Sequence, residues 1–457
     1  PENSFRSSAQ SVPLDTQEDR DNYADALRRY AVYLGGQTDK LREQADRGIR
    51  VPKPALPSAR AVVRNLTDAS VAFVPNRARM PALDDVQAED FRRTVSALVE
   101  SDIKPAFQHM GSVLDADYEA LAPMRVGLMH QPGGLDIYRE LVALYTGTDL
   151  SPEQIHETGQ SILRDARAEL EGIWTELGFE GTKEEFAQKV DADPRFRAET
   201  SEDIERFFLD AMERIEPSLA DYFDLLPEAP YTVERAPRAV EEGMTFGYYR
   251  PPSERNPVGA YVYNGSDPSD RSYANAAALI YHELLPGHHF QIALALEDET
   301  LPLLQRGNAF VPTTAYVEGW AEYAADLAGE MGLYQTPYER YGRLYSKMFL
   351  ANRLMTDTGL NALGWTLDEA RTFMRENTFA SDAEIESELL RYSTDIPGQA
   401  LAYAMGQREL LRMRSKARSA LGEDFNFPDF HREVLRHGAL PIGLLEDQLD
   451  LWIETTR

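Results

Sequence analysis

Helix-start signals recur along this chain and constrain its fold more than any other feature. Each is a Ser or Thr followed three residues later by a Glu or Gln, whose side chains satisfy backbone N–H groups that the first helical turn leaves free. The chain carries this signal at Ser151 and Gln154, Thr182 and Glu185, Thr366 and Glu369, and Ser381 and Glu384. Apolar residues follow the first signal at helical spacing, so we predict a mainly α protein.

The pattern changes between residues 225 and 270, where seven prolines separate short aromatic or β-branched runs. Such runs, bounded by turn residues, are typical of short strands. We predict a small sheet of two to four strands over 231–233, 245–249 and 260–263. Helical patterns then continue to the end of the chain, and another Pro/Gly-rich break spans 123–134. We interpret 1–224 as an N-terminal helical region and 225–457 as a second, catalytic region, the two forming one continuous unit around a cleft.

Charge and composition exclude several classes of partner. Lys and Arg number 47 against 76 Asp and Glu, for a net charge of −29. Because nucleic acids and anionic membranes bind cationic faces, we expect neither as a partner. Cysteine is absent, which excludes disulfides, cysteine-based zinc sites and cysteine nucleophiles. No apolar run approaches the roughly 20 residues of a membrane helix, and the first residues show no signal segment, so we expect a cytoplasmic protein.

Three of the eight histidines, His282, His288 and His289, fall within eight residues. Glu283 follows the first of them, and helix-compatible residues flank the group. Zinc hydrolases often carry two His ligands one helical turn apart, with a Glu general base directly after the first. Here the position four residues after His282 is Pro286, so the short form of this motif is absent.

Pro286 and Gly287 offer a way to restore the geometry. On an uninterrupted helix, a residue six positions after His282 points about 120° away from it, and the next lies about 10 Å further along the axis. Proline lacks an N–H and clashes with the carbonyl of His282, while glycine adopts backbone conformations closed to other residues. We therefore predict a kink or bulge between Glu283 and His288 that brings the second histidine back toward the first.

A zinc hydrolase needs a third protein ligand, and segment 316–326 is the obvious source. Glu318 and Glu322 lie four residues apart, hence on one helix face, among apolar and small neighbours. Buried carboxylates are unfavourable unless they are paired or bind a metal. Glu318 as ligand and Glu322 as hydrogen-bond partner of a ligand histidine would satisfy both groups. The alternative is an exposed acidic stripe on an acidic protein.

The segments around these residues resemble a known family. His-Glu-Leu-Leu-Pro-Gly-His-His-Phe-Gln over 282–291, followed by Glu-Gly-Trp-Ala-Glu-Tyr over 318–323, resembles bacterial domain-of-unknown-function family 885. Residues 150–159 and 259–264, and the C-terminal pieces 391–392 and 397–403, resemble further parts of the same family. That family in turn resembles a branch of the gluzincin-type zinc metallopeptidases.

The resemblance implies a multi-helix, metallopeptidase-like fold with a central cleft and a small β-sheet before the active-site helix. It also implies one Zn²⁺ ion held by His282, His288 and Glu318, with Glu283 as general base. We prefer His288 over His289 as ligand, because the pair Gly287 and His288 matches the Gly-His that ends the shorter motif of relatives. His289 and Glu322 are then expected to support the ligands.

These residues predict a zinc-dependent peptidase that hydrolyses peptides or oligopeptides. Tyr403 is the first candidate for the donor that stabilises the oxyanion, and Tyr392 is the second. We expect Tyr261, Asn264 and Gln399 to contact the substrate, with the strand at 261–264 pairing with an extended peptide. Two alternatives stay open, a non-catalytic binding protein and a zinc hydrolase of a non-peptide amide. The histidines expected to be structural are His156, His431 and His437.

Overall fold

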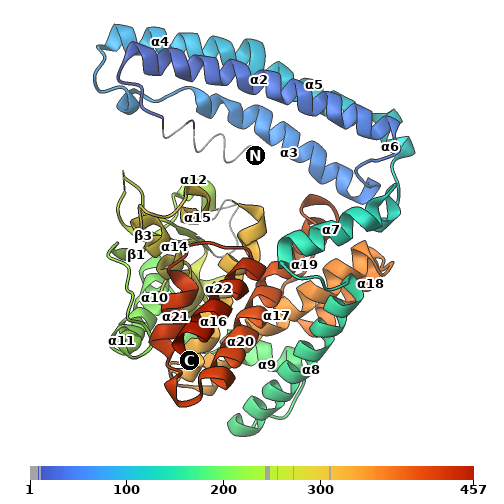
Figure 1. The fold of residues 1–457 in the computed structure, drawn as a ribbon. Coiled ribbons are helices and arrows are strands. Elements are labelled where there is room, and N and C mark those ends of the chain that lie inside the picture. Colours follow the sequence, from blue (N-terminus) through green and yellow to red (C-terminus); the bar gives the residue numbers. More distant parts are fainter. Residues whose placement is uncertain (1–8, 10–11, 242–246, 255, 271, 308–309) are drawn as a thin grey trace. The chain divides into compact units, whose positions relative to one another are not determined.

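The computed structural model describes residues 9, 12–241, 247–254, 256–270, 272–307 and 310–457, and Figure 1 shows the fold. The chain divides into two compact units, Pro1–Gly134 and Leu135–Arg457. This division lies at the end of the Pro/Gly-rich break over 123–134, whereas the boundary predicted at 224 falls inside the second unit. Helices dominate both units, which confirms the predicted mainly α class.

The first unit is a set of helices that pack along one another (Figure 1). They are α2 (Gln17–Asp46), α3 (Leu56–Ala69), α4 (Asp85–Leu98), α5 (Lys104–Val113) and α6 (Ala116–Leu121). Helix α5 lies against both α2 and α3, and the buried core between helices of this unit includes Tyr30, Phe73 and Phe107. The unit therefore buries a hydrophobic core of its own.

The second unit holds the remaining helices and the sheet. Its helices up to the sheet are α7 (Gly134–Thr146), which begins at the boundary, α8 (Pro152–Leu177), α9 (Lys183–Asp191), α10 (Ser201–Ile215) and α11 (Leu219–Tyr222). The later helices are α12 (Arg238–Glu241), α13 (Ala276–Glu283), α14 (His288–Glu297), α15 (Leu303–Arg306), α16 (Thr314–Glu330), α17 (Pro337–Asn361), α18 (Leu367–Asn377), α19 (Asp382–Leu390), α20 (Ala402–Leu421), α21 (Phe427–Leu435) and α22 (Ile442–Thr456).

The four predicted helix starts are all present. Capping boxes at Ser151, Thr182, Thr366 and Ser381 begin helices α8, α9, α18 and α19. In each box the Ser or Thr accepts a hydrogen bond from the backbone of the Glu or Gln, whose side chain accepts one in return. These signals act locally, which is why sequence alone locates the helix starts.

Three short strands form the sheet: β1 (Tyr231–Arg235), β2 (Gly247–Arg250) and β3 (Gly259–Tyr263). Their order is β1-β3-β2, with β1 parallel and β2 antiparallel to β3. The predicted small sheet is therefore confirmed, although residues 245 and 246 of its predicted second strand lie outside the described residues. Strand β3 is central and buried along its whole length.

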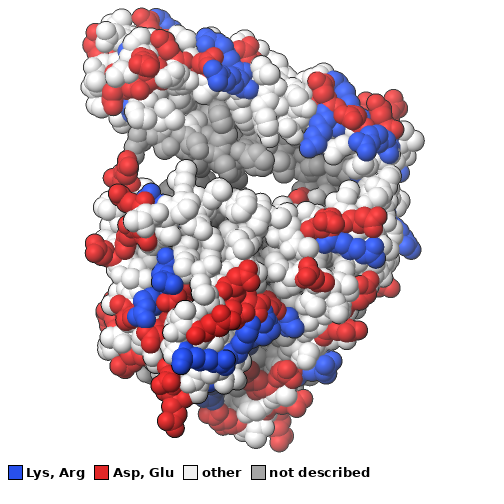
Figure 2. Space-filling model, viewed as in Figure 1, with Lys and Arg blue, Asp and Glu red and all other residues white. Residues whose placement is uncertain are grey.

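Helices α13, α14, α16, α17 and α20 surround the centre of the second unit. Helix α16 lies against α13, α14 and α20, and α17 packs along α8. The sequence of α16 is rich in alanine, glycine and aromatic residues, and most of the helix is buried. On the face shown in Figure 2, acidic and basic side chains stand side by side at several places.

Candidate metal centre

The Pro286–Gly287 segment interrupts the helix as predicted. Helix α13 ends at Glu283 and α14 begins at His288. The turn folds back so tightly that a Cβ on Gly287 would lie 1.8 Å from the carbonyl oxygen of His282. The Nε1 of Trp320 on α16 donates a hydrogen bond to the carbonyl oxygen of Pro286 at 2.9 Å. Glycine is therefore required at this turn, and α16 holds the turn in place.

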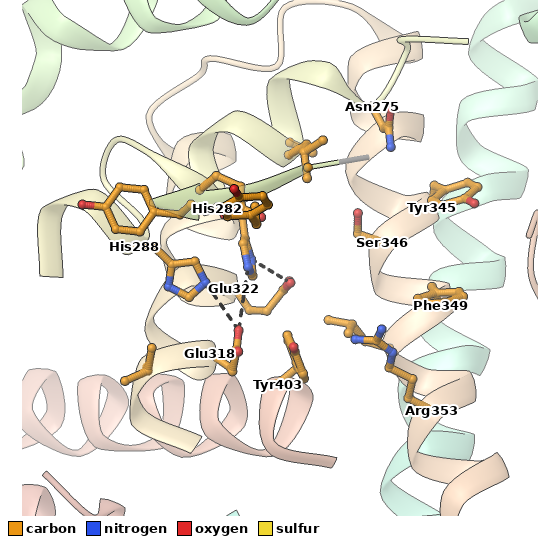
Figure 3. Close-up of a pocket in the computed structure, with 18 of the residues that line it drawn as sticks. Asn275, His282, His288, Glu318, Glu322, Tyr345, Ser346, Phe349, Arg353 and Tyr403 are labelled. Carbon is orange, nitrogen blue, oxygen red and sulfur yellow. Dashed lines mark ion pairs between the residues drawn. The ribbon is translucent and has the colours of Figure 1, made fainter. Parts of the chain in front are cut away.

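The interruption brings His282 and His288 together with Glu318 of α16 (Figure 3). The two imidazole rings are 4.7 Å apart between centroids and nearly perpendicular. Oε2 of Glu318 lies 3.4 Å from Nε2 of His288 and 3.9 Å from Nε2 of His282. One potential ligand atom of each residue falls within 4.8 Å of the other two. This spacing suits a single metal ion among the three side chains.

Glu322 fixes the orientation of His282. Its Oε1 lies 3.0 Å from Nδ1 of His282, and its Oε2 lies 2.6 Å from Nη1 of Arg343 on α17. Arg343 also binds Asp326 through Nε at 2.8 Å and donates to the backbone carbonyl of Glu322. A partner on Nδ1 leaves Nε2 of His282 to face the centre, as in metal-ligating histidines.

Glu283, the last residue of α13, lines the same cavity as the cluster. Burial raises the pKa of its carboxyl, although the two neighbouring imidazoles oppose the shift. Burial disfavours the protonated form of His282, but the surrounding carboxylates, Glu322 first, outweigh this and raise its pKa to about 9. Carboxylates thus outnumber imidazoles at this centre, and their charge favours a cation.

His289 points away from the cluster. Its Nδ1 lies 3.0 Å from the hydroxyl of Tyr249, and its Nε2 lies 3.0 Å from the carbonyl oxygen of Ala229. The side chain is fully buried beneath the sheet, where a Cβ on Gly259 would meet it at 2.3 Å. Burial lowers the pKa of His289 to about 4, so the ring is neutral. The histidine that joins Glu318 is therefore His288.

A cavity of about 620 Å³ opens over the cluster. Its walls come from β2, α13, α14, α16 and α17, and from residues between 384 and 403. Tyr403 lies in this wall near Glu318 (Figure 3). Tyr392 is fully buried outside the lining and donates to Glu388. Gln399 lies outside the lining and accepts a hydrogen bond from Arg391, which does line the cavity.

Two predicted substrate contacts lie away from this cavity. Tyr261 is fully buried against Phe208 of α10, and Asn264 bonds to the backbone of Glu241 and to Ser266. The reason is the strand order: β3 is central, so its main-chain groups already pair with β1 and β2. Among the described residues, the strand that lines the cavity is β2, with Tyr248 and Tyr249.

The chain matches the family described as bacterial protein of unknown function (DUF885) over residues 1–449. It belongs to this family. A solved structure, described as "the putative lipoprotein from Colwellia psychrerythraea", is 27% identical with a TM-score of 0.87, and the match covers 98% of this chain and 78% of that one. A second, described as "a putative lipoprotein of unknown function from Shewanella oneidensis", is 18% identical with a TM-score of 0.70, over 98% and 81% of the two chains, and supports the fold alone.

No curated protein matches this DUF885 chain. Within the part of the chain that the structure describes, no helix combines the length and apolar character needed to cross a membrane.

The sequence analysis did not predict that three arginines line this cavity. Arg343 and Arg353 on α17 and Arg391 after α19 all line it. A signal existed in α17, where Arg343, Ser346, Leu350 and Arg353 recur at spacings of three, four and three, which places them along one helix face. Without knowing that this face borders a cavity, such arginines read as ordinary surface charges.

Proposed function

We propose that this protein is a zinc-dependent peptidase of the gluzincin type. The observation that carries the proposal is the convergence of His282, His288 and Glu318 beside Glu283 at one wall of a cavity. Two imidazoles and one carboxylate are a donor set typical of catalytic zinc, which keeps a further position open. Glu322 behind His282 supplies the carboxylate partner that such histidines usually have. The donor chemistry therefore fits Zn²⁺.

When bound, the zinc ion supplies a Lewis acid that polarises the scissile carbonyl and lowers the pKa of water to about 7. Glu283 takes a proton from the attacking water as the new C–O bond forms, and delivers it to the leaving nitrogen as the C–N bond breaks. The raised pKa of its carboxyl suits this role, because a stronger base removes the proton more readily.

Tyr403 is the best placed of the two tyrosines to donate to the developing oxyanion. It lines the cavity, as Glu318 does. Tyr392 lies outside the lining and donates a hydrogen bond to Glu388. Burial and the nearby carboxylate of Glu318 raise the pKa of Tyr403, which keeps its hydroxyl protonated. An extended substrate would pass β2, whose edge opposite β3 has no strand partner among the described residues.

Metal analysis and peptide digestion together test the proposal. Protein purified without a polyhistidine tag should bind close to one zinc per chain by elemental analysis. A peptide library should then be cleaved with zinc present and left intact after chelation, as read by mass spectrometry. Zinc binding with no peptide cleavage would overturn the peptidase and leave a binding protein or a hydrolase of other amides. Absence of zinc binding would remove the metal centre itself.

A further inference from the structure

A second charged cluster lies in the same cavity, apart from the metal centre. Arg353 on α17 and Arg391, at the start of the π-helical turn Arg391–Asp395, share one carboxylate, that of Glu388 on α19. Nε of Arg353 lies 3.0 Å from Oε2 of Glu388, and Nη1 of Arg391 lies 3.2 Å from Oε1. All three side chains line the cavity. Within this cluster two guanidinium groups share one carboxylate, so the cluster itself carries a net positive charge.

From this imbalance we infer that Arg353 and Arg391 bind a carboxylate of the substrate, and that this carboxylate is the C-terminal one of a peptide. The inference rests on the proposed peptidase function and names its substrate class. Guanidinium groups bind carboxylates with paired, planar hydrogen bonds. Two arginines that share one carboxylate in the cavity of a chain with net charge −29 are therefore a specific feature rather than a general attraction for anions.

The Arg353 guanidinium is held in place, and some of its N–H groups stay available to a ligand. Its Cζ lies 4.8 Å from the ring centroids of both Phe349 and Tyr403. Among the described residues, its one hydrogen bond is from Nε to Glu388, so both Nη groups keep donors for a ligand. The side chain is 12% exposed, and that exposure faces the cavity it lines. A rigid donor of this kind binds an anion with little loss of side-chain entropy.

Arg343 provides a contrast within the same cavity. Its guanidinium is already engaged by Glu322 through Nη1, by the backbone of Glu322 through Nη2 and by Asp326 through Nε. Both carboxylates face Arg343, although Asp326 also pairs with Lys347 and Glu322 with His282. The same helix thus carries one arginine committed to the metal centre and one available to a ligand.

The position of the cluster sets where the peptide is cut. Tyr403 lines the cavity together with Glu318, its ring centroid lies 4.8 Å from Cζ of Arg353, and Figure 3 shows Tyr403 between these two residues. One side chain therefore separates the metal ligand from the arginine. A peptide advances at most about 3.6 Å per residue, so a C-terminal carboxylate at Arg353 leaves room for one or two residues before the scissile bond. Cleavage should release a single residue or a dipeptide from the C-terminus.

Matched peptides test this assignment. One peptide sequence is prepared with a free C-terminal acid, with a C-terminal amide, and as an amide carrying Asp or Glu at the last position. We expect kcat/KM for the acid to exceed that for the plain amide by about 10- to 100-fold, the loss expected when a charged partner is removed. Equal values would overturn the inference. Restored cleavage of the amide by a terminal Asp or Glu would also overturn it, because the site would then bind side-chain carboxylates.

Variants connect the preference to the arginines. Arg391→Gln and Arg353→Gln should bring the acid-to-amide ratio of kcat/KM close to one, and Arg353→Lys should keep part of it. Arg340→Gln is the matched control, because Arg340 lies on α17 outside the cavity lining and pairs with Glu176; it should keep the full ratio. An unchanged ratio in both Gln variants, with zinc content and circular dichroism intact, would overturn the inference.

Binding separates failure of this inference from failure of the peptidase. In Glu283→Gln, titration calorimetry with the same acid and amide peptides measures recognition without turnover. Tighter binding of the acid, lost on adding Arg391→Gln, supports the carboxylate site even if no peptide is cleaved by the parent protein. Equal binding of acid and amide overturns the carboxylate site even where zinc-dependent cleavage is observed.

Discussion

At the scale of single residues, Glu283 is the most direct test of the chemistry. Glu283→Gln keeps the shape of the side chain and removes its basic carboxylate. Turnover should fall by a factor on the order of 100 or more, while zinc content stays near that of the parent because Glu283 is outside the ligand set. Steady-state kinetics with elemental analysis checks this. Equal turnover in the variant would remove Glu283 from the mechanism.

The ligand set can be tested one side chain at a time. His282→Ala, His288→Ala and Glu318→Ala should each lower zinc bound per chain, because each removes one of three converging ligand atoms. His289→Ala is the matched control, since that ring faces Tyr249 and the backbone of Ala229. Elemental analysis after dialysis measures the zinc bound per chain in each variant. Loss of zinc in His289→Ala alone would mean that the neighbouring histidine is the ligand.

At the scale of secondary-structure elements, the crossing of α16 and α20 holds Glu318 in position. A Cβ on Gly319 would lie 2.4 Å from the backbone of Gly406, and a Cβ on Gly406 would lie 1.8 Å from the carbonyl oxygen of Ala315. Gly319→Ala should therefore push the helices apart, lower the free energy of unfolding by about 1–3 kcal/mol and weaken zinc binding. Urea denaturation and zinc titration measure both effects.

Gly172 of α8 supplies the control for this substitution, because no atom lies within 4 Å of a Cβ built there. Gly172→Ala should leave zinc binding unchanged and stabilise the protein by up to about 1 kcal/mol, the helix preference of alanine over glycine. Similar behaviour of the two alanine variants would contradict the role given to the α16–α20 crossing.

The secondary-structure elements show which parts of the fold and of the site could be predicted from the sequence. Helix starts such as Ser151 and the interruption at Pro286 depend on residues a few positions apart, so local chemistry predicts them. The strand order depends on pairing of β1 with β3, whose paired residues are 28 positions apart, and no local signal marks β3 as central. The sequence therefore predicts substrate contacts for Tyr261 and Asn264, whereas the strand that lines the cavity is β2. Arg353 and Arg391 come together only through packing of α17 and α19.

At the scale of the whole molecule, the metal centre belongs to the second unit alone. Every described residue that lines the cavity lies beyond residue 246, yet helices before residue 225 support the cavity. α8 packs along α17 so closely that a Cβ on Gly159 would lie 3.0 Å from the carbonyl oxygen of Ala351. The hydroxyl of Tyr281 on α13 donates to the backbone of Ala211 on α10. Removing α8 and α10 would expose the core faces of α17 and α13.

Two fragments test this dependence. A fragment of residues 135–457 should fold and bind zinc at the stoichiometry of the full chain, because it keeps the compact unit Leu135–Arg457. A fragment of residues 225–457 should fail to fold, because it lacks α8 and α10. Circular dichroism, thermal melting and elemental analysis compare the two. A folded, zinc-binding 225–457 fragment would show that the helices before residue 225 are dispensable.

The hydrogen bond from Trp320 to the carbonyl of Pro286 gives the chain an optical reporter of its own. Trp320 is fully buried, and it is one of four tryptophans. The others lie elsewhere in the fold: Trp174 on α8, Trp365 between α17 and α18, and Trp452 on α22. Because the indole is tied to the turn between the two histidines, zinc binding should change the intrinsic fluorescence without any added dye. Trp320→Phe should abolish that change while the emission of the other indoles remains, so stopped-flow fluorescence can time the arrival of the metal.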